Sequence, residues 1–175
     1  NITEQKDYHG IRLHIPVAMD TISQVLSMDI GFGDVITPSP VQLDYPLLIS
    51  TLPQASIMAY SVETVIAEKM HAVIDLGNQS SRMKDYYDLF HLLHEGNYDP
   101  ETLIDAVVNT FRNRHTGYKE DAAFFSPSFK DDLMLTTRWK AFMRRIKSDS
   151  TLTFSEVVIY LQDALGSYWE ALRHD

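Results

Sequence analysis

The segment from Ser61 to Leu93 contains a lysine, an arginine and an aspartate whose spacing places them near one another on two predicted helices. Counted at about 100° per residue, Lys69 falls inside the apolar stripe of one predicted helix, and Asp85 flanks the apolar face of the next, with Arg82 on the same side. An ammonium that converges with an acid and a guanidinium on one cleft suits a polyanion such as a triphosphate. The alternative for Lys69 is a long stem that crosses apolar surface to reach water.

Other charged residues allow either a site or an ordinary solvated surface. Lys84 and Asp88 are one turn apart, so a surface ion pair explains them as well as a site does. Asp29 lies near the end of an apolar strand, where a carboxylate can bind a divalent cation or take a proton from an attacking hydroxyl, although acids are common at strand ends. His91 and His94 have a spacing that metal ligands use, but no third ligand is suitably spaced, and we do not predict zinc.

A basic stretch without acids lies near the C-terminus of a chain whose formal net charge is -9. Helical spacing places Lys140, Arg144 and Lys147 on one face, and it places Arg138 and Arg145 on another. The acidic chain is not expected to coat nucleic acid generally, but the stripe of three can bind RNA phosphates as a local patch. A solvated helix face over an aromatic core is an equally good interpretation.

The first third of the chain is predicted to contain strands. Alternating apolar residues over 10–19 and the apolar segment 25–30 predict two strands, and 37–40 is predicted to be an extended linker because of its prolines. Residues 45–52 are predicted to hold a short strand or bend, and 56–60 to lead into the first helix.

The rest of the chain is predicted to be helical, with Gly77 ending the first helix. The predicted N-caps are Ser80 or Ser81 for the second helix, Asp99 (followed by Pro100) for the third, Ser126 or Ser128 for the fourth, and Thr153 with Glu156 for the fifth.

Length and composition limit the class of protein. The 175 residues, 45% hydrophobic and 22% charged, are enough for one compact domain or two small lobes. The absence of cysteine excludes disulfides and thiolate metal sites and fits a cytoplasmic protein. No apolar run of about 18 residues occurs, so neither a membrane span nor a signal peptide is predicted. Because the chain begins at Asn1 rather than methionine, we expect a fragment of a longer protein.

Several sequence blocks resemble a known protein family. They are DIGFGD (29–34), YSVET (60–64), AEK (67–69) and SRMKDYYDL (81–89), with weaker similarity at 110–111, 114–116 and Trp139. Together they are similar to the AbiEii/AbiGii toxin family of nucleotidyltransferases. These are the toxin halves of bacterial type IV toxin–antitoxin and phage-defence systems.

The resemblance implies an α+β fold like that of DNA polymerase β. Residues 1–60 would be the remainder of the nucleotidyltransferase sheet region, and 61–175 a C-terminal helical lobe that carries the later active-site motifs. The implied reaction transfers a nucleoside monophosphate from a nucleoside triphosphate (NTP), with Mg²⁺, to an acceptor such as the 3′ end of tRNA. A cognate antitoxin is an implied partner. No membrane partner is expected, because the chain has no long apolar run.

The resemblance also assigns roles to particular residues. Asp29 resembles the third strand carboxylate, which helps to hold the metal and to activate the acceptor hydroxyl. Lys69 resembles the lysine that holds the triphosphate. Asp85 resembles the essential acid of the last motif, with Arg82 and Lys84 as its nucleotide-binding neighbours.

One family motif does not occur in this sequence. The family opens with a glycine-glycine-small-residue turn and an Asp-x-Asp strand whose aspartates hold the metals, and neither is present before Asp29. We therefore expect a nucleotidyltransferase in the full-length form and an inactive 175-residue chain. The alternative is a non-catalytic binding module of the same ancestry that pairs with an antitoxin or another protein.

Overall fold

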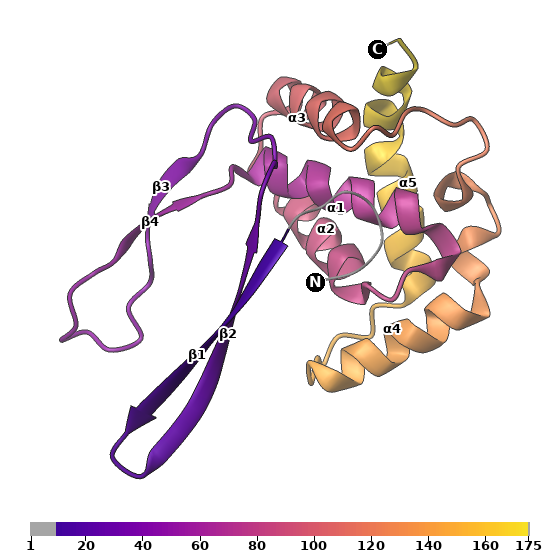
Figure 1. The fold of residues 1–175 in the computed structure, drawn as a ribbon. Coiled ribbons are helices and arrows are strands. Elements are labelled where there is room, and N and C mark those ends of the chain that lie inside the picture. Colours follow the sequence, from indigo (N-terminus) through magenta and orange to yellow (C-terminus); the bar gives the residue numbers. More distant parts are fainter. Residues whose placement is uncertain (1–9, 175) are drawn as a thin grey trace. The chain divides into compact units, whose positions relative to one another are not determined.

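The computed structural model describes residues 10–174, and the chain divides into one compact unit that ends at Val35 and another that begins at Ile36 (Figure 1). The described residues form two small antiparallel sheets and five α-helices, which confirms the predicted α+β class. The predicted domain boundary after residue 60 stays a prediction.

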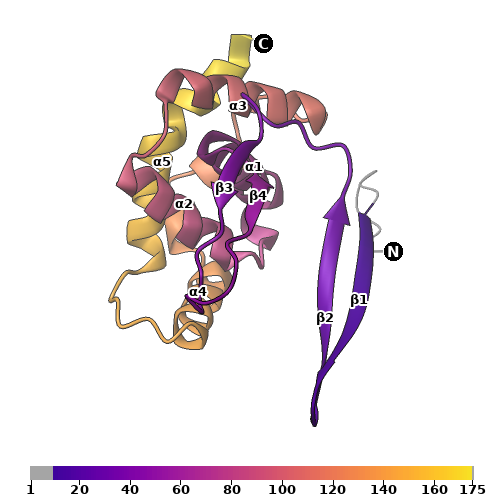
Figure 2. The same ribbon diagram turned by 90° about the vertical axis from the view of Figure 1, so that its left-hand side faces the viewer.

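The first unit contains a long hairpin of strands β1 (Gly10–Met19) and β2 (Ile22–Gly31), a two-stranded sheet that is clear in Figure 2. Both predicted strands are confirmed, although β2 begins before the predicted residue 25. The register pairs Ile11 with Ile30, Leu13 with Met28 and Ile15 with Leu26, so the apolar side chains of both strands share one face.

Alternation of apolar residues is typical of a half-buried strand, but among the described residues this apolar face is largely exposed. Leu13 of β1 is 40% exposed, and Leu26 of β2, which pairs with Ile15, is 52% exposed. Alternation of apolar and polar residues indicates that a strand has one apolar and one polar face, but it does not indicate which element covers the apolar face.

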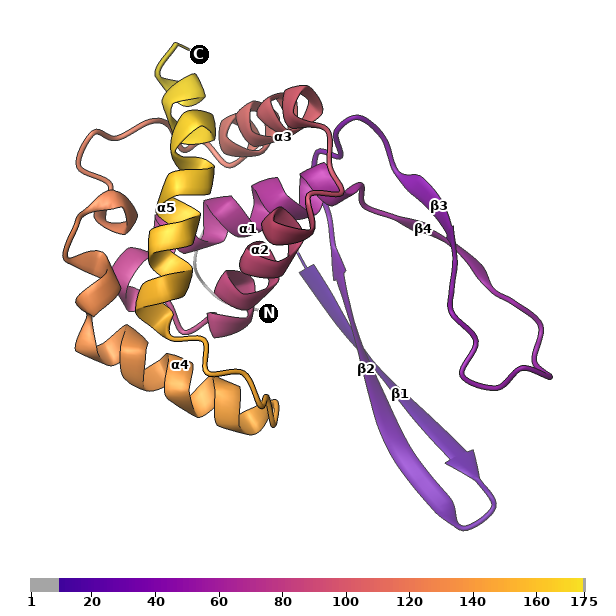
Figure 3. The ribbon, with the colours of Figure 1, turned by 180° about the vertical axis from the view of Figure 1, so that it is seen from behind.

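A second, shorter hairpin joins β3 (Val41–Asp44) to β4 (Ser56–Ala59) and extends from the N-terminal end of α1 (Figure 3). Residues 45–52 were predicted to hold a short strand or bend, and they hold bends and a turn without a strand, within the 45–55 connection between β3 and β4. Residues 56–60 lead into α1 as predicted, but the strand β4 within them was not predicted. Strands of four residues are too short for periodicity to identify reliably.

Five helices form the bulk of the second unit. They are α1 (Val62–Leu76), α2 (Met83–Glu95), α3 (Pro100–Asn113), α4 (Leu133–Arg145) and α5 (Phe154–Ala171). Helix α1 packs against α2 and α3, and α5 packs against α2, α3 and α4 (Figure 1). The largest fully buried side chains come from all five helices and from the short turns before α4: Ile66, Met70, Tyr86, Leu89, Leu103, Phe111, Phe124, Phe129, Leu135, Trp139, Phe154 and Leu161.

Local signals set the beginnings of three helices. The Ser61 side chain accepts a hydrogen bond from the Thr64 amide at the start of α1, and Asp99 caps α3 with proline at its first position. At the start of α5, Thr153 and Glu156 form the predicted capping box. The predicted caps of α3 and α5 are therefore confirmed.

The predicted caps of α2 and α4 were wrong. Arg82 occupies the N-cap position of α2 without a side-chain cap, and Ser80 Oγ instead accepts from the Arg82 amide at 3.2 Å. Helix α4 is capped by Asp132, whose side chain accepts from the Leu135 amide. In both places a 3₁₀ turn (77–79 and 129–131) lies before the helix. The helices therefore begin later than the predicted serine caps would place them, at Met83 and Leu133.

Candidate active site

Lys69 lies on α1 beside the residues that hold this helix in the core. Ile66, Met70 and Val73 are fully buried, and their spacing directs one face of α1 into the helical core. Lys69 stands at the margin of that face, and its side chain is 19% exposed. It is therefore neither a core residue nor a lysine that extends into open water.

The ammonium of Lys69 is held by two carboxylates of α2. Lys69 Nζ lies 2.8 Å from Asp85 Oδ1 and 2.6 Å from Asp88 Oδ2. Residues three apart on a helix are neighbours on its surface, so Asp85 and Asp88 can both reach one group on the facing helix. The structure thus brings Lys69 and Asp85 together, and it adds Asp88, which the sequence interpretation had paired only with Lys84.

Two more basic residues complete this arrangement from the N-terminal part of α2. Arg82 Nε lies 2.8 Å from Asp85 Oδ2, an ion pair without hydrogen-bond alignment, and Lys84 Nζ lies 2.5 Å from Asp88 Oδ2. We call Lys69, Arg82, Lys84, Asp85 and Asp88 the charged cluster. Its three cations and two acids alternate in space and leave one net positive charge.

Exposure differs among the cations of the charged cluster. The side chains of Arg82 and Lys84 are 61% and 71% exposed, whereas the side chain of Lys69 is 19% exposed. A ligand from solvent would therefore meet Arg82 and Lys84 first and Lys69 last.

The protonation of Lys69 and Asp88 follows from burial and pairing. Burial by itself lowers the pKa of Lys69, but the hydrogen bonds and charges of Asp85 and Asp88 outweigh it and raise the pKa above its ordinary value. Burial by itself raises the pKa of Asp88, but Lys69 and Lys84 outweigh it and lower the pKa. Both groups are therefore held in their charged forms at neutral pH.

Neighbours of Lys69 fix α1 to the segment after α3. Glu68 forms an ion pair with Arg114, and His71 Nε2 lies 2.9 Å from Thr116 Oγ1, with the His71 ring edge-on to Phe111. These contacts join the AEK block to residues 114–116, two blocks that are separate in the sequence. The sequence interpretation missed these contacts, because charge at Glu68 and Arg114 gives no signal of which partner each will meet.

Comparison with known proteins decides the family. A family model described as "Nucleotidyl transferase AbiEii toxin, Type IV TA system" matches residues 1–166. The chain belongs to the AbiEii family. Neither the curated proteins nor the solved structures gave a match. The recognition made from the sequence blocks is thereby confirmed, and the AEK and SRMKDYYDL blocks of this AbiEii chain are the ones that form the charged cluster.

Asp29 of the AbiEii chain lies on the polar face of the β1–β2 hairpin, where both of its oxygens face Arg12. Arg12 Nε donates to Oδ1 at 2.6 Å, and Nη2 donates to Oδ2 at 2.8 Å. The hydrogen bond from Arg12 lowers the pKa of this exposed carboxyl. Asp29 belongs to the unit that ends at Val35, which is described by itself, so its role in holding a metal and activating the acceptor hydroxyl stays a prediction.

The residues that the structure describes do not fit a complete Mg²⁺ site. Within residues 10–174, no group of three or more histidine, aspartate or glutamate side chains is placed to hold a metal ion. A metal ion at Asp29 would have to displace Arg12, and the two acids of the charged cluster are already neutralised by Lys69 and its basic neighbours.

The basic stretch of α4 is only partly arranged as predicted. Lys140 and Arg144 are exposed and one turn apart on α4. Lys147 lies beyond the end of the helix, in a left-handed backbone conformation with φ of 53°. Helical spacing therefore does not apply to Lys147, and only two of the three predicted RNA contacts share a helical face.

Two other bases of this stretch have structural partners. Arg138 Nη1 donates to the carbonyl oxygens of Ser80 at 2.6 Å and Gln79 at 3.2 Å, which fixes the turn before α2. The Arg145 guanidinium lies over the Phe142 ring, 5.7 Å from its centroid. Both were predicted to lie apart from the stripe of three.

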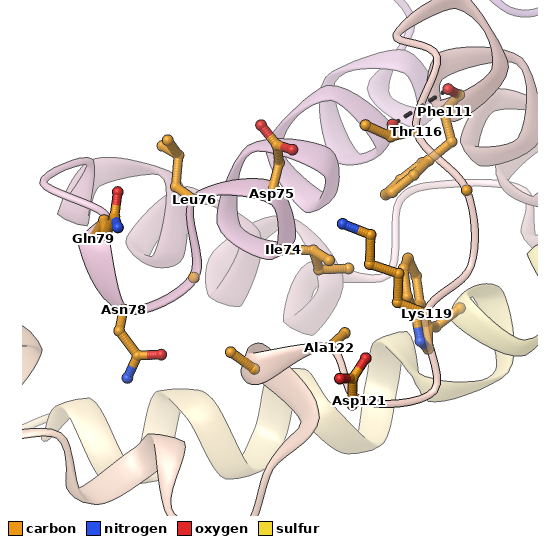
Figure 4. A pocket seen from close by; sticks show the side chains of 14 residues that line it. Ile74, Asp75, Leu76, Asn78, Gln79, Phe111, Thr116, Lys119, Asp121 and Ala122 are labelled. Atoms are coloured by element: carbon orange, nitrogen blue, oxygen red, sulfur yellow. Dashed lines mark hydrogen bonds between the residues drawn. The ribbon is translucent and has the colours of Figure 1, made fainter.

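A pocket of about 470 Å³ lies at the C-terminal end of α1 (Figure 4). Its lining includes Ile74, Phe111, Lys119 and Asp121, and no predicted site residue belongs to it. None of the described helices of the AbiEii chain is long and apolar enough to cross a membrane.

Proposed function

We propose that this AbiEii chain carries the triphosphate-binding part of a nucleotidyltransferase. The enzyme would move a nucleoside monophosphate from an NTP to an acceptor such as the 3′ end of tRNA. The observation that carries the proposal is the charged cluster, in which Lys69, Arg82 and Lys84 converge and outnumber the two acids Asp85 and Asp88 by one charge. Charge-assisted hydrogen bonds to phosphate are among the strongest polar contacts that a protein makes.

The chemistry defines what these residues would do. An acceptor hydroxyl attacks the α-phosphorus, a new P–O bond forms, the bond to the oxygen bridging to the β-phosphate breaks, and pyrophosphate leaves. Lys69, Arg82 and Lys84 would bind the β- and γ-phosphates and stabilise the charge that develops on the departing pyrophosphate. Asp29, by its resemblance to the family carboxylate, would take the proton of the hydroxyl. Mg²⁺ is expected from the same resemblance for the full-length protein, in which it would supply positive charge to the phosphates.

The biological setting follows from the family. Since the chain belongs to a type IV toxin family, we propose that the full-length protein acts in the cytoplasm, in phage defence, and pairs with a cognate antitoxin.

A second candidate function is a non-catalytic binding module that pairs with an antitoxin or another protein. It is supported by the finding that residues 10–174 hold no group of three metal-ligating side chains. The long apolar face of the β1–β2 hairpin, largely exposed in this structure, also fits a surface that another protein covers.

The test is nucleotide transfer by the full-length protein. Each ribonucleoside triphosphate, labelled at the α-phosphate, is incubated with Mg²⁺ and tRNA, for the wild type and for Lys69→Ala. Loss of one group that stabilises the leaving phosphates is expected to lower the transfer rate at least about a hundredfold. Lys130→Ala is the matched control, because Lys130 pairs with its neighbour Asp131, outside the charged cluster.

Circular dichroism and a melting curve establish that Lys69→Ala is folded at the assay temperature. Transfer by this variant at the wild-type rate would exclude the charged cluster as the triphosphate site. If the wild type transfers no label but forms a stable complex with its antitoxin, the binding module is the better description.

A further inference from the structure

Asp88 contacts two cations of the charged cluster through a single oxygen. Its Oδ2 lies 2.6 Å from Lys69 Nζ on α1 and 2.5 Å from Lys84 Nζ on its own helix. Asp85, one turn earlier, has the corresponding place between Lys69 and Arg82. The two acids therefore link three cations from two helices into one continuous chain of charges.

Three cations gathered this closely repel one another, and a ligand-free site must resist that repulsion. Lys84 has a mostly exposed side chain, so without a partner it would extend into water and lose its defined place. Lys69 is largely buried and would lose one of its two carboxylates. Asp85 cannot replace Asp88, because it already serves Arg82 and does not contact Lys84.

We propose that Asp88 is a positioning residue of the triphosphate site, which holds Lys69 of α1 and Lys84 of α2 at one spacing so that an incoming triphosphate meets both. This inference rests on the proposed function, in which these lysines bind phosphates. Asp88 would make no contact with the nucleotide itself. It would act through the two lysines, which turn from its carboxylate to the phosphate oxygens as the ligand binds.

The charged surroundings of Lys69 define what Asp88 contributes. From α2, Lys69 faces Asp85 and Asp88, and on its own helix the neighbouring Glu68 is paired with Arg114. Removing the charge of Asp88 leaves Asp85 as the acid in contact with Lys69, and Asp85 is shared with Arg82. The Lys69 amine should then lose its proton at a lower pH.

The experiment compares the wild-type full-length protein with Asp88→Asn and Asp88→Glu. The extent of Lys69 acetylation by acetic anhydride is measured by mass spectrometry as a function of pH, with and without each ribonucleoside triphosphate. Asp88→Asn is expected to move the midpoint of Lys69 labelling to lower pH, and Asp88→Glu to restore most of it. Asp105→Asn on α3, an exposed acid away from the charged cluster, is the matched control and should leave the midpoint unchanged.

Transfer kinetics test the positioning role separately. Asp88→Asn is expected to raise the KM for NTP about tenfold, because misplaced binding groups cost affinity, with a smaller change in kcat. An unchanged labelling midpoint, or a KM that falls, would overturn the inference; a fall would mean that Asp88 competes with the phosphates. If Asp88→Asn moves the labelling midpoint but no triphosphate protects Lys69 of the wild type from acetylation, Asp88 does position Lys69 and the proposed triphosphate-binding function is wrong.

Discussion

The ion pair between Lys69 and Asp85 provides the most direct test of the charged cluster. The perturbation is a double-mutant cycle with Lys69→Met, Asp85→Asn and the combined variant, which isolates the interaction between the two side chains. Lys69 Nζ lies 2.8 Å from Asp85 Oδ1, and the two side chains are 19% and 7% exposed.

The structure sets the expected magnitude. Truncation of a partly exposed lysine usually changes the free energy of unfolding by about 1 kcal/mol or less. Hydrogen bonds to charged groups contribute about 1.5–3 kcal/mol, and exposed ion pairs at most about 1 kcal/mol. Because each partner keeps a second one, Asp88 for Lys69 and Arg82 for Asp85, we expect a coupling free energy of about 1–2 kcal/mol.

The assay is urea unfolding of the four proteins at neutral pH, followed by far-ultraviolet circular dichroism and by the fluorescence of the buried Trp139 and Trp169. A control cycle uses Glu170 and Arg173, whose charged atoms are 3.4 Å apart and whose side chains are 54% and 47% exposed. Its coupling should stay below about 0.5 kcal/mol.

A coupling between Lys69 and Asp85 no larger than that of the control would refute the reasoning. The charged cluster would then be a solvated set of surface charges, and its convergence would carry no argument for a phosphate site.

Three further predictions concern nucleotide transfer by the 175-residue chain, the pH dependence of its stability and the basic stretch of α4. The 175-residue chain alone should transfer no labelled nucleotide to RNA at any Mg²⁺ concentration, because a single carboxylate at Asp29 cannot hold the metals that bridge the reacting phosphates; measurable transfer would show that other carboxylates do this work. Folding raises the pKa of Lys69, so the stabilisation from charged Lys69 is full below pH 10.5, its ordinary pKa, and is lost as pH rises through the pKa of the folded protein. Folding lowers the pKa of Asp88, so the stabilisation from charged Asp88 is full above pH 3.8, its ordinary pKa, and is lost as pH falls through the pKa of the folded protein. The difference in urea midpoint between wild type and Lys69→Met should therefore be constant between these limits and shrink outside them, and a difference that persists at lower pH would contradict the assignment. If Lys140, Arg144 and Lys147 all contact single-stranded RNA, affinity should fall about twentyfold between about 50 and 200 mM salt, and changing all three to Gln should flatten this dependence; equal slopes would place the RNA elsewhere.

Signals within a few residues of each other predicted much of the helical part of the fold. Asp99 followed by Pro100 marked the start of α3, and the Thr153–Glu156 pair marked the start of α5. Such caps depend on hydrogen bonds between residues two or three apart, so the sequence contains both partners in the right order. The two strands of the first unit were predictable for a similar reason, since alternation is a property of the strand itself.

Elements whose limits depend on distant contacts were predicted less well. Ser80 was a reasonable cap for α2, but Arg138 of α4 donates to the carbonyl oxygen of Ser80 and holds it in the turn before the helix. The hairpin of β3 and β4 pairs residues that a 45–55 loop separates, and each strand alone is too short to be distinguished from an irregular segment.

The sequence by itself determined the residue types of the candidate site and part of its geometry. It placed Lys69 on an apolar stripe of one helix, and Asp85 and Arg82 on one side of the next helix. Both placements could be predicted because they depend only on the period of an α-helix. Only the tertiary structure decided that Asp88 shares Lys69 with Asp85.

The same is true of other contacts in the two units. The pairing of Glu68 with Arg114, the bidentate contact of Arg12 with Asp29 and the position of Lys147 beyond α4 were all decided by the folded chain. Helical period fixes the direction of a side chain on its own element, whereas its partner depends on how close, and in which register, a second element packs. That packing is set by buried apolar side chains throughout the second unit, and no short motif contains it.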